Sequence, residues 1–467
     1  MKQALHIFKK DVRYLRYDIG ITLLAIVGFC FIHNPLIPLV TWWFLISRVI
    51  HAEALPGDRQ FWLTRPYEWK SLLGAKILFI FIFVNLPLLV ADAVIIRRAG
   101  FSIGQEWAGL LWTQVLLITA FVLPAAAFSA ITKGLGELLT MTLFLVIGFL
   151  TWVVTSPLMI HPGFYWMELE WVKTYCLVGQ LAAAAAIVLL WQYARRNTFA
   201  TRMTAGATAV VVLASSSLLP WTAAFALQTH LSKQKMDASS LRIELDSGRK
   251  WLGHIYAAGQ DQMVAELPLQ FSGVPAGTEL KPNGATMTLR APDGETWIVK
   301  QPPPSSLNFE SGVTSLRAVM GKAFYTKVKN QPLQLRGTLY FTLYGNKRGT
   351  PLPLNSRPLP VNGVGICSAD THFLLCYSAF RTRSDLVAIE TLEDSPSGPK
   401  EKTESLAGLA SYSPFPAELN VDPVSRFFLP RTRTISGARV EALQPLAHLE
   451  RSFEIEHVRL DDFVTLQ

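Results

Sequence analysis

Charged residues are scarce in this sequence of 467 residues: they make up 16% of the chain, against about a quarter in typical soluble proteins. Half of the chain, 50%, is hydrophobic. The apolar excess lies before about Leu227, and so does most of the formal net charge of +9. A nucleic-acid-binding protein gathers its positive charge on a soluble domain. No nucleic-acid partner is therefore expected, and the basic residues suit the flanks of membrane segments.

The sequence also lacks the motifs of several enzyme classes. There is no Gly-x4-Gly-Lys-Ser/Thr loop for a nucleotide, because Gly321-Lys322 has neither the upstream glycine nor the hydroxyl residue. No His-Glu-x-x-His pair for zinc and no Cys-x-x-Cys pair occurs. We therefore expect no catalytic residues, no cofactor and no metal in this chain. Energy for any transport would come from a gradient or from another polypeptide.

Cysteine is rare, with 4 in the whole chain. Cys30 and Cys176 fall in apolar runs, whereas Cys367 and Cys376 fall in the polar second half, at a spacing that a hairpin or loop bridges. A disulfide between the latter two is permitted if that half lies outside the cytoplasm. Two buried free thiols are an equal alternative, because residue separation does not fix geometry.

Long apolar runs dominate residues 19–227, which we interpret as a transmembrane domain. They cover residues 19–32, 35–50, 77–96, 107–131, 135–158, 172–193 and 204–227. A membrane span needs about 20 apolar residues, so the first two runs are short and can also form one broken span or a re-entrant hairpin. Basic residues gather in the N-terminus, in the 51–76 loop and from Arg195 to Arg202, which predicts that all three are cytoplasmic. Seven spans, with the N-terminus inside and the C-terminus outside, satisfy this.

The apolar half also has an amphipathic N-terminal segment, an ionisable residue inside one run, and three prolines. Residues 1–18 read as a basic amphipathic helix that lies in the membrane interface and contacts lipid. Asp92 is an ionisable residue within the third run, which makes it a functional candidate. An ion pair with Arg97 or Arg98 at the end of that run is the other interpretation of Asp92. The prolines at positions 87, 124 and 220 are expected to kink their helices.

Residues 228–467 have a different pattern. Short alternating segments, such as 241–245, 287–290 and 339–344, are separated by turn signals that include Pro282-Asn-Gly and Pro292-Asp-Gly. This alternation predicts a mainly β, sandwich-like extracytoplasmic domain.

The loop at 51–76 is charged and rich in aromatic residues, and it joins the second and third runs. Breaks at Pro56-Gly57 and Arg65-Pro66 leave room for a short helix that carries Phe61, Trp62 and Leu63. We interpret it as a cytoplasmic docking element for a soluble partner. The alternative is that Trp62, Tyr67 and Trp69 belong to an aromatic belt at the lipid headgroups.

This block resembles the ABC-2 type permeases, the membrane subunits of ATP-binding-cassette exporters. The matching positions are Glu53, Gly57, Phe61 to Leu63, Pro66, Leu72-Leu73 and Lys76. Phe8-Lys9-Lys10-Asp11 is similar to the interfacial elbow helix of that family. Asp58 departs from the pattern, since a hydroxyl residue often follows the glycine. A seventh span and a β domain after the usual six spans depart from it too.

The resemblance implies a permease subunit in the bacterial inner membrane that pairs with a second copy or a sister permease. Its partner would be an ATPase subunit that binds ATP and Mg²⁺. In such permeases this loop docks in a groove on the ATPase: Phe61, Trp62 and Leu63 would anchor the contact, and Arg59, Arg65 and Glu53 would orient it. A membrane-anchored sensor or scaffold, whose β domain binds an extracytoplasmic ligand, is the alternative function. A gradient-driven transporter ranks last because it would carry more paired intramembrane charges.

Overall fold

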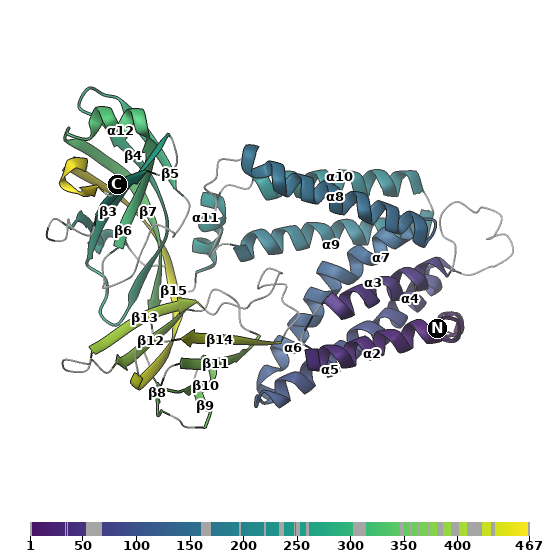
Figure 1. The fold of residues 1–467 in the computed structure, drawn as a ribbon. Helices are drawn as coiled ribbons and strands as arrows, with labels where there is room; N and C mark the ends of the chain where they lie inside the picture. Colours follow the sequence, from purple (N-terminus) through teal and green to yellow (C-terminus); the bar gives the residue numbers. More distant parts are fainter. Residues whose placement is uncertain are drawn as a thin grey trace.

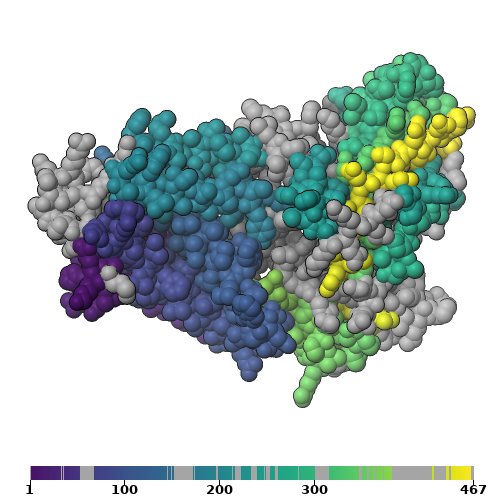
Figure 2. All heavy atoms as spheres, turned by 180° about the vertical axis from the view of Figure 1, so that it is seen from behind, coloured from purple at the N-terminus to yellow at the C-terminus, as the bar shows by residue number. Residues whose placement is uncertain are grey.

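The computed structural model describes the chain from residue 2 to residue 465, with gaps. The gaps are residues 33, 35, 53–67, 160–169, 196–197, 219–220, 233–237, 247, 249–252, 258–260, 302–313, 346–349, 355–356, 362–363, 372, 381–385, 394–400, 409–422 and 431–434. The described part is an elongated molecule in which a helical region and a mainly β region lie end to end (Figures 1 and 2). The expected division between a helical first half and a β second half is confirmed.

Eleven helices of the described chain belong to the first region and one to the second. They are α1 (Lys2–Tyr14), α2 (Arg16–Ile32), α3 (Leu36–His51), α4 (Trp69–Ile80), α5 (Leu86–Arg98), α6 (Ile103–Leu117), α7 (Leu123–Ala130), α8 (Leu135–Met159), α9 (Glu170–Arg195), α10 (Thr198–Leu218), α11 (Trp221–Leu231) and α12 (Lys322–Val328). Each of the seven apolar runs coincides with one or two of these helices. The apolar composition of the runs therefore located the helices well.

Fewer of these helices meet the length and hydropathy expected of a membrane span. Within the described residues, three do so: the continuous helices Trp69–Arg98 and Ile103–Ala130, and Thr174–Arg195. A fourth is added if α1 and α2, which are bent by 76° relative to one another, count as one broken span. The chain thus has three to four helices that can cross a membrane by length and composition. The expected seven spans are more than these helices support.

The two longest continuous helices each contain a π-helical turn. These turns cover Phe81–Asn85, between α4 and α5, and Ile118–Val122, between α6 and α7. Each ends two residues before a proline, Pro87 or Pro124. Because proline has no N–H and its ring crowds the preceding turn, widening that turn lets the helix continue. The structure thus has a π-helical turn that ends two residues before each of two prolines expected to kink their helices, and the third, Pro220, lies outside the described residues.

Polar side chains within the helical region bond to each other. Asn85, at the end of the first π turn, donates from Nδ2 to Oε1 of Gln114 on α6 over 3.2 Å. The helices share one apolar core, which includes Phe29, Trp42 and Phe79. An amide pair inside an apolar core satisfies polar groups that would otherwise be costly to bury.

The β region contains the described strands. They are β1 (Arg242–Leu245), β2 (His254–Ala257), β3 (Gln262–Ser272), β4 (Glu279–Arg290), β5 (Thr296–Gln301), β6 (Thr314–Gly321), β7 (Leu333–Gly345), β8 (Thr350–Leu352), β9 (Leu359–Val361), β10 (Gly365–Ala369), β11 (Phe373–Ala379), β12 (Leu386–Glu393), β13 (Glu401–Gly408), β14 (Val424–Pro430), β15 (Ile435–Val458) and β16 (Val464–Thr465). All of these pairings are antiparallel except the parallel pair of β2 and β16.

Three sheets form two lobes of this region. In the upper lobe of Figure 1, a sheet of β1, β2, β3, β6 and β16 faces the end of a larger sheet that contains β7, β4 and β5. The two sheets share a core to which Leu267, Leu289 and Phe341 contribute. In the lower lobe, the sheet β14-β11-β10-β9 packs with part of β15 around a second core.

One long strand connects the two lobes. The first part of β15 pairs with β12, and from Gln444 onward it pairs with β7. The register with β7 shifts between Pro445 and Ala447, soon after the change of partner. Proline cannot donate to a ladder, so it is suited to such an irregularity. A single covalent strand therefore carries the sheet from one lobe into the other.

Of the two turn signals, one is confirmed and one is wrong. Pro292-Asp-Gly lies in the turn between β4 and β5, where Gly294 has φ of 90°. The expected turn at Pro282-Asn-Gly is instead part of β4, at a bulge where the register to β7 shifts between Pro282 and Gly284. Asn283 is 1% exposed, and its Nδ2 donates to Oγ1 of Thr342 on β7 over 2.6 Å. This bond holds the segment beside β7, and the strand continues.

The two regions touch through specific side chains. Gly109 on α6 lies against the ring of Phe380, which follows β11, and a side chain at position 109 would overlap that ring. Phe225 on α11 meets the ring of Tyr340 on β7 edge-on, with centroids 5.0 Å apart. Contacts from both lobes thus join the β region to the helices.

Candidate functional site

The residues of the expected docking element lie outside the described residues. This applies to Glu53, Gly57, Arg59, Phe61, Trp62, Leu63, Arg65 and Pro66. The structure does describe both flanks of the segment: α3 ends at His51 before it, and α4 begins at Trp69 after it.

A buried ion pair fixes the flank that follows the loop. Nζ of Lys76 on α4 lies 2.8 Å from Oδ2 of Asp11 on α1, and the two side chains are 2% and 0% exposed. Phe8, one turn earlier on α1, packs against Phe79 and Phe83. The N-terminal helix α1 is therefore attached to α4, the helix that follows the loop.

The sequence analysis singled out both Asp11 and Lys76 but did not predict that they pair. A signal was available, because Ile7, Asp11 and Leu15 follow each other at intervals of four and form one helical stripe. Ile7 and Leu15 are 1% and 0% exposed, so the carboxylate lies on the buried face of a basic helix. A buried carboxylate needs a cation nearby.

Hydroxyl and imidazole groups fix the flank that precedes the loop. Ser47 on α3 shares a hydrogen bond of 2.9 Å with Ser129 on α7. One turn further, Nε2 of His51 shares a hydrogen bond of 3.0 Å with Oγ1 of Thr132, just after α7. The end of α3 is thus bonded to the end of α7.

The same end of the bundle holds a further polar link. Arg202 on α10 donates to the carbonyl oxygen of Ile131 over 2.9 Å and to Oε1 of Glu137 on α8 over 2.6 Å. Ile131 and Thr132 are neighbours. A series of polar contacts therefore runs from the end of α3 through the α7–α8 turn to α10.

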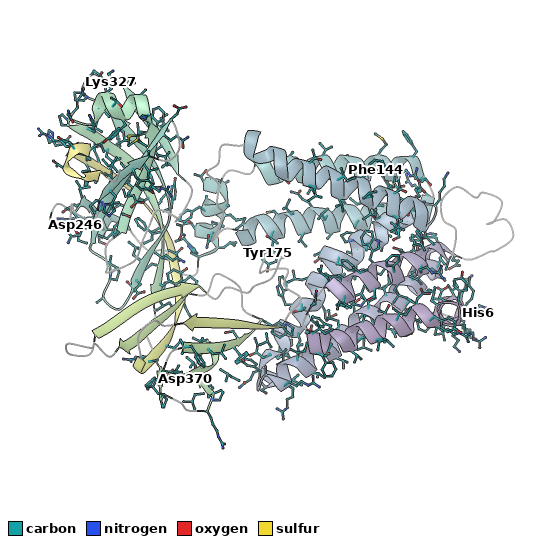
Figure 3. The ribbon with its side chains drawn as sticks, viewed as in Figure 1. His6, Phe144, Tyr175, Asp246, Lys327 and Asp370 are labelled. Atoms are coloured by element: carbon teal, nitrogen blue, oxygen red, sulfur yellow. A yellow bond between two sulfur atoms is a disulfide. The ribbon has the colours of Figure 1, made fainter. Side chains whose placement is uncertain are left out.

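These contacts lie at the end of the molecule farthest from the β region. Figure 3 shows His6 of α1 at that end, and Tyr175, near the start of α9, on the side toward the β region. Figure 1 shows that α3 ends and α4 begins at the same end of the bundle as α1. The N-terminus, both loop flanks and the 131–134 turn therefore share one end.

Asp92, the intramembrane candidate, lies on α5 and is 0% exposed. The guanidinium of Arg98, at the end of the same helix, lies 5.1 Å from the centre of the Phe31 ring on α2. An ion pair of Asp92 with Arg97 or Arg98 stays a prediction. Because Asp92 is buried, replacing it by an apolar side chain tests whether its carboxylate is needed for function.

The sequence Gly100-Phe-Ser-Ile-Gly104 has the spacing of a Gly-x-Ser-x-Gly nucleophile elbow, which sequence reasoning missed. In hydrolases that motif follows a strand and opens a helix. Here it follows α5 and opens α6, with Ser102 immediately before the first residue of the helix. The match therefore gives no argument for a hydrolase. In the described residues, no group of His, Cys, Asp and Glu side chains can hold a metal ion.

The possible disulfide is formed. Cys367 on β10 and Cys376 on β11 are bonded to one another, and they are directly opposite in the register of the two strands. Both are 0% exposed within the core of the lower lobe. Of the two alternatives, bond or free thiols, the structure has the bond.

A buried polar cluster lies where α11 meets the β region. Asn283 donates to Oγ1 of Thr342, and Oγ1 shares a bond of 2.9 Å with Nδ1 of His448 on β15. The ring of Phe225 covers His448 edge-on, with centroids 6.1 Å apart. Burial lowers the pKa of His448 to about 4, so the imidazole is neutral near neutral pH.

This cluster predicts a loss of stability in acid. An unfolded histidine has a pKa of about 6.5, so between about pH 6.5 and pH 4 the unfolded chain binds a proton that folded His448 does not, and unfolding is favoured as pH falls. The variant His448→Asn keeps an acceptor for Thr342 but cannot titrate. Thermal unfolding at several pH values is expected to show a smaller loss in acid for this variant. Equal losses would contradict the prediction.

Neither protein-family models nor curated protein sequences give a match to this chain.

Proposed function

We propose that this chain is the permease subunit of an ABC-2 type exporter, which couples ATP hydrolysis by a separate ATPase to movement of a substrate across the bacterial inner membrane. A pair of such subunits, or one with a sister permease, would work with two ATPase subunits. The residues 53–67 would form the contact with the ATPase, and this chain would supply no catalytic group.

The observation that most supports this proposal is the buried ion pair of Asp11 and Lys76. It joins two segments that resemble the family, the elbow-like helix α1 and the start of α4, which follows the loop. Once one partner is buried, removing the other leaves a charge without compensation. The pair would therefore make α1 and α4 move together when the ATPase displaces the loop.

The other flank favours the same interpretation. Because α3 is bonded to α7 through Ser47 and His51, displacement of the loop would also reach α7, and through Arg202 it would reach α10. Closure of two ATPases can thus shift several helices at once, which is what a switch between inward and outward access needs. ATP energy from the partner would enter through one short segment.

The proposed topology has seven spans, with the N-terminus in the cytoplasm and the β region outside. The N-terminus, the loop flanks and the 131–134 turn lie at one end of the bundle, and the β region lies at the other (Figure 1). Basic residues at the first end, such as Lys9, Lys10 and Arg13, agree with a cytoplasmic side. The disulfide in the β region agrees with an oxidising compartment.

Charge reversal in the loop tests the proposal. The variants Arg65→Glu and Glu53→Lys are each expected to reduce the ATPase that co-purifies with the protein by roughly tenfold or more, as the loss of an interface hot spot does. Their thermal unfolding should stay unchanged. The control Arg290→Glu reverses an exposed charge of the β region and should retain the ATPase. Normal co-purification from both loop variants would refute the proposal.

A further inference from the structure

A cluster of arginine and tyrosine side chains lies at the bend between α1 and α2. Nη2 of Arg16 donates to the hydroxyl of Tyr17 over 2.8 Å, and the guanidinium lies 4.7 Å from the centre of that ring. The guanidinium of Arg48 on α3 lies 5.9 Å from the Tyr14 ring. Tyr14 and Tyr17 are 63% and 72% exposed. Two exposed phenol groups, each beside a guanidinium, thus lie at this bend, and the Arg48 side chain is 39% exposed.

The hydrogen-bonding capacity of Arg48 is only partly used. Its one ion pair in the described structure joins Nη2 to Oδ2 of Asp18 at 3.7 Å, longer than a charge-assisted hydrogen bond. Its Nε is buried and has no hydrogen-bond partner among the described residues, so a ligand at the surface would meet the Nη groups of this side chain, which is 39% exposed. A guanidinium presents a planar fork of donors that fits the oxygens of a phosphate. Among the described residues, Asp18 is the one carboxylate that pairs with either arginine, so the cluster keeps a net positive charge.

The exposed face of α2 continues from this cluster as an apolar stripe. Ile21, Leu24 and Phe31 follow Tyr17 at helical spacing, with exposures of 61%, 72% and 66%. Such a stripe faces acyl chains when the helix lies in a bilayer. A ligand with a phosphate at one end and hydrocarbon along its length matches both parts of this surface. A free phosphate ion matches the first part only.

We propose that Arg16, Arg48, Tyr14 and Tyr17 bind the phosphate headgroup of an anionic phospholipid, whose acyl chains lie along α2. The cluster is at the bundle end that carries the loop flanks, so the lipid belongs to the leaflet on that side. Clustered basic residues at a membrane surface favour anionic over zwitterionic lipids. The site thus extends the interfacial role of α1 to a defined lipid contact next to the docking loop. It does not depend on the proposed transport function.

Native mass spectrometry of the full chain in mild detergent tests this proposal. Phosphatidylglycerol and phosphatidylcholine are added in equal amounts, and the lipid retained by the protein is counted. The wild type is expected to retain phosphatidylglycerol preferentially. The double variant Arg16→Gln with Arg48→Gln is expected to retain roughly tenfold less, the factor that matches the loss of one charge-assisted hydrogen bond.

The control removes two exposed cations from the same end of the bundle, away from α2, by Lys133→Gln with Arg195→Gln. It should retain phosphatidylglycerol as the wild type does. If the Arg48 change impairs folding, Arg16→Gln alone is tested. Its hydrogen bond to Tyr17 is exposed, so its loss should not impair folding. Equal retention by the arginine variants and the control would overturn the proposal. Displacement of the lipid by millimolar inorganic phosphate would overturn the lipid as the ligand.

Discussion

Replacing Lys76 by methionine is expected to destabilise the protein by about 3–5 kcal/mol, because it leaves the carboxylate of Asp11 buried without its cation. Asp11 is 0% exposed, so water cannot take the place of the ammonium group. The double variant Asp11→Leu with Lys76→Met removes both charges and is expected to recover most of the loss, since apolar replacement of a whole buried pair is often neutral.

Thermal unfolding in detergent, followed by tryptophan fluorescence, measures this effect. The control is Lys70→Met, which removes an exposed lysine from the first turns of the same helix and should change the midpoint little. If the single and double variants lose the same stability, the ion pair does not attach α1 to α4. The coupling path suggested for the loop would then lack its main contact.

Loss of the disulfide is the second large effect. The bond between Cys367 and Cys376 closes a loop with a sequence separation of 9, and the loop-entropy relation gives a stabilisation of about 2–3 kcal/mol for a loop of this size. The double variant Cys367→Ala with Cys376→Ala is therefore expected to unfold at a lower temperature. Reduction of the wild type should have the same effect and should not affect the variant.

Alkylation of the denatured protein checks the bond directly. The free cysteines of the structure are Cys30 and Cys176, so two thiols should react before reduction and four after it. Four reactive thiols before reduction, in protein taken from cells and trapped at once, would contradict the bond. It would also remove the support that the bond gives to an extracytoplasmic β region.

The sequence predicted the positions of the helices well, because an apolar run of membrane length rarely forms any structure other than a helix. It also separated the β region, since alternation of period 2 is visible in segments such as 339–344, which lie in β7. It did not show how many helices are true spans. Helix α3 has 16 residues, and such a length permits a short span, a tilted one or a re-entrant segment.

Long-range pairing was the part that local patterns did not show. Asp11 and Lys76 are separated by 65 residues, and no periodicity relates one to the other. Thr342 and His448 are likewise brought together by the pairing of β7 with β15. The Pro282-Asn-Gly signal failed for the same reason, because a bond to Thr342 on another strand decides its conformation. The cysteine bond stayed open until the register of β10 and β11 was known.

The most direct test of the transport proposal is a mild-detergent affinity purification of the tagged native protein, with mass spectrometry of what accompanies it. We expect a stoichiometric ATPase with a nucleotide-binding P-loop. Replacing Phe61, Trp62 and Leu63 together by alanine should remove it, because apolar side chains would anchor the contact. Absence of an ATPase from membranes in which its gene is expressed would contradict the permease function and favour a membrane-anchored sensor or scaffold.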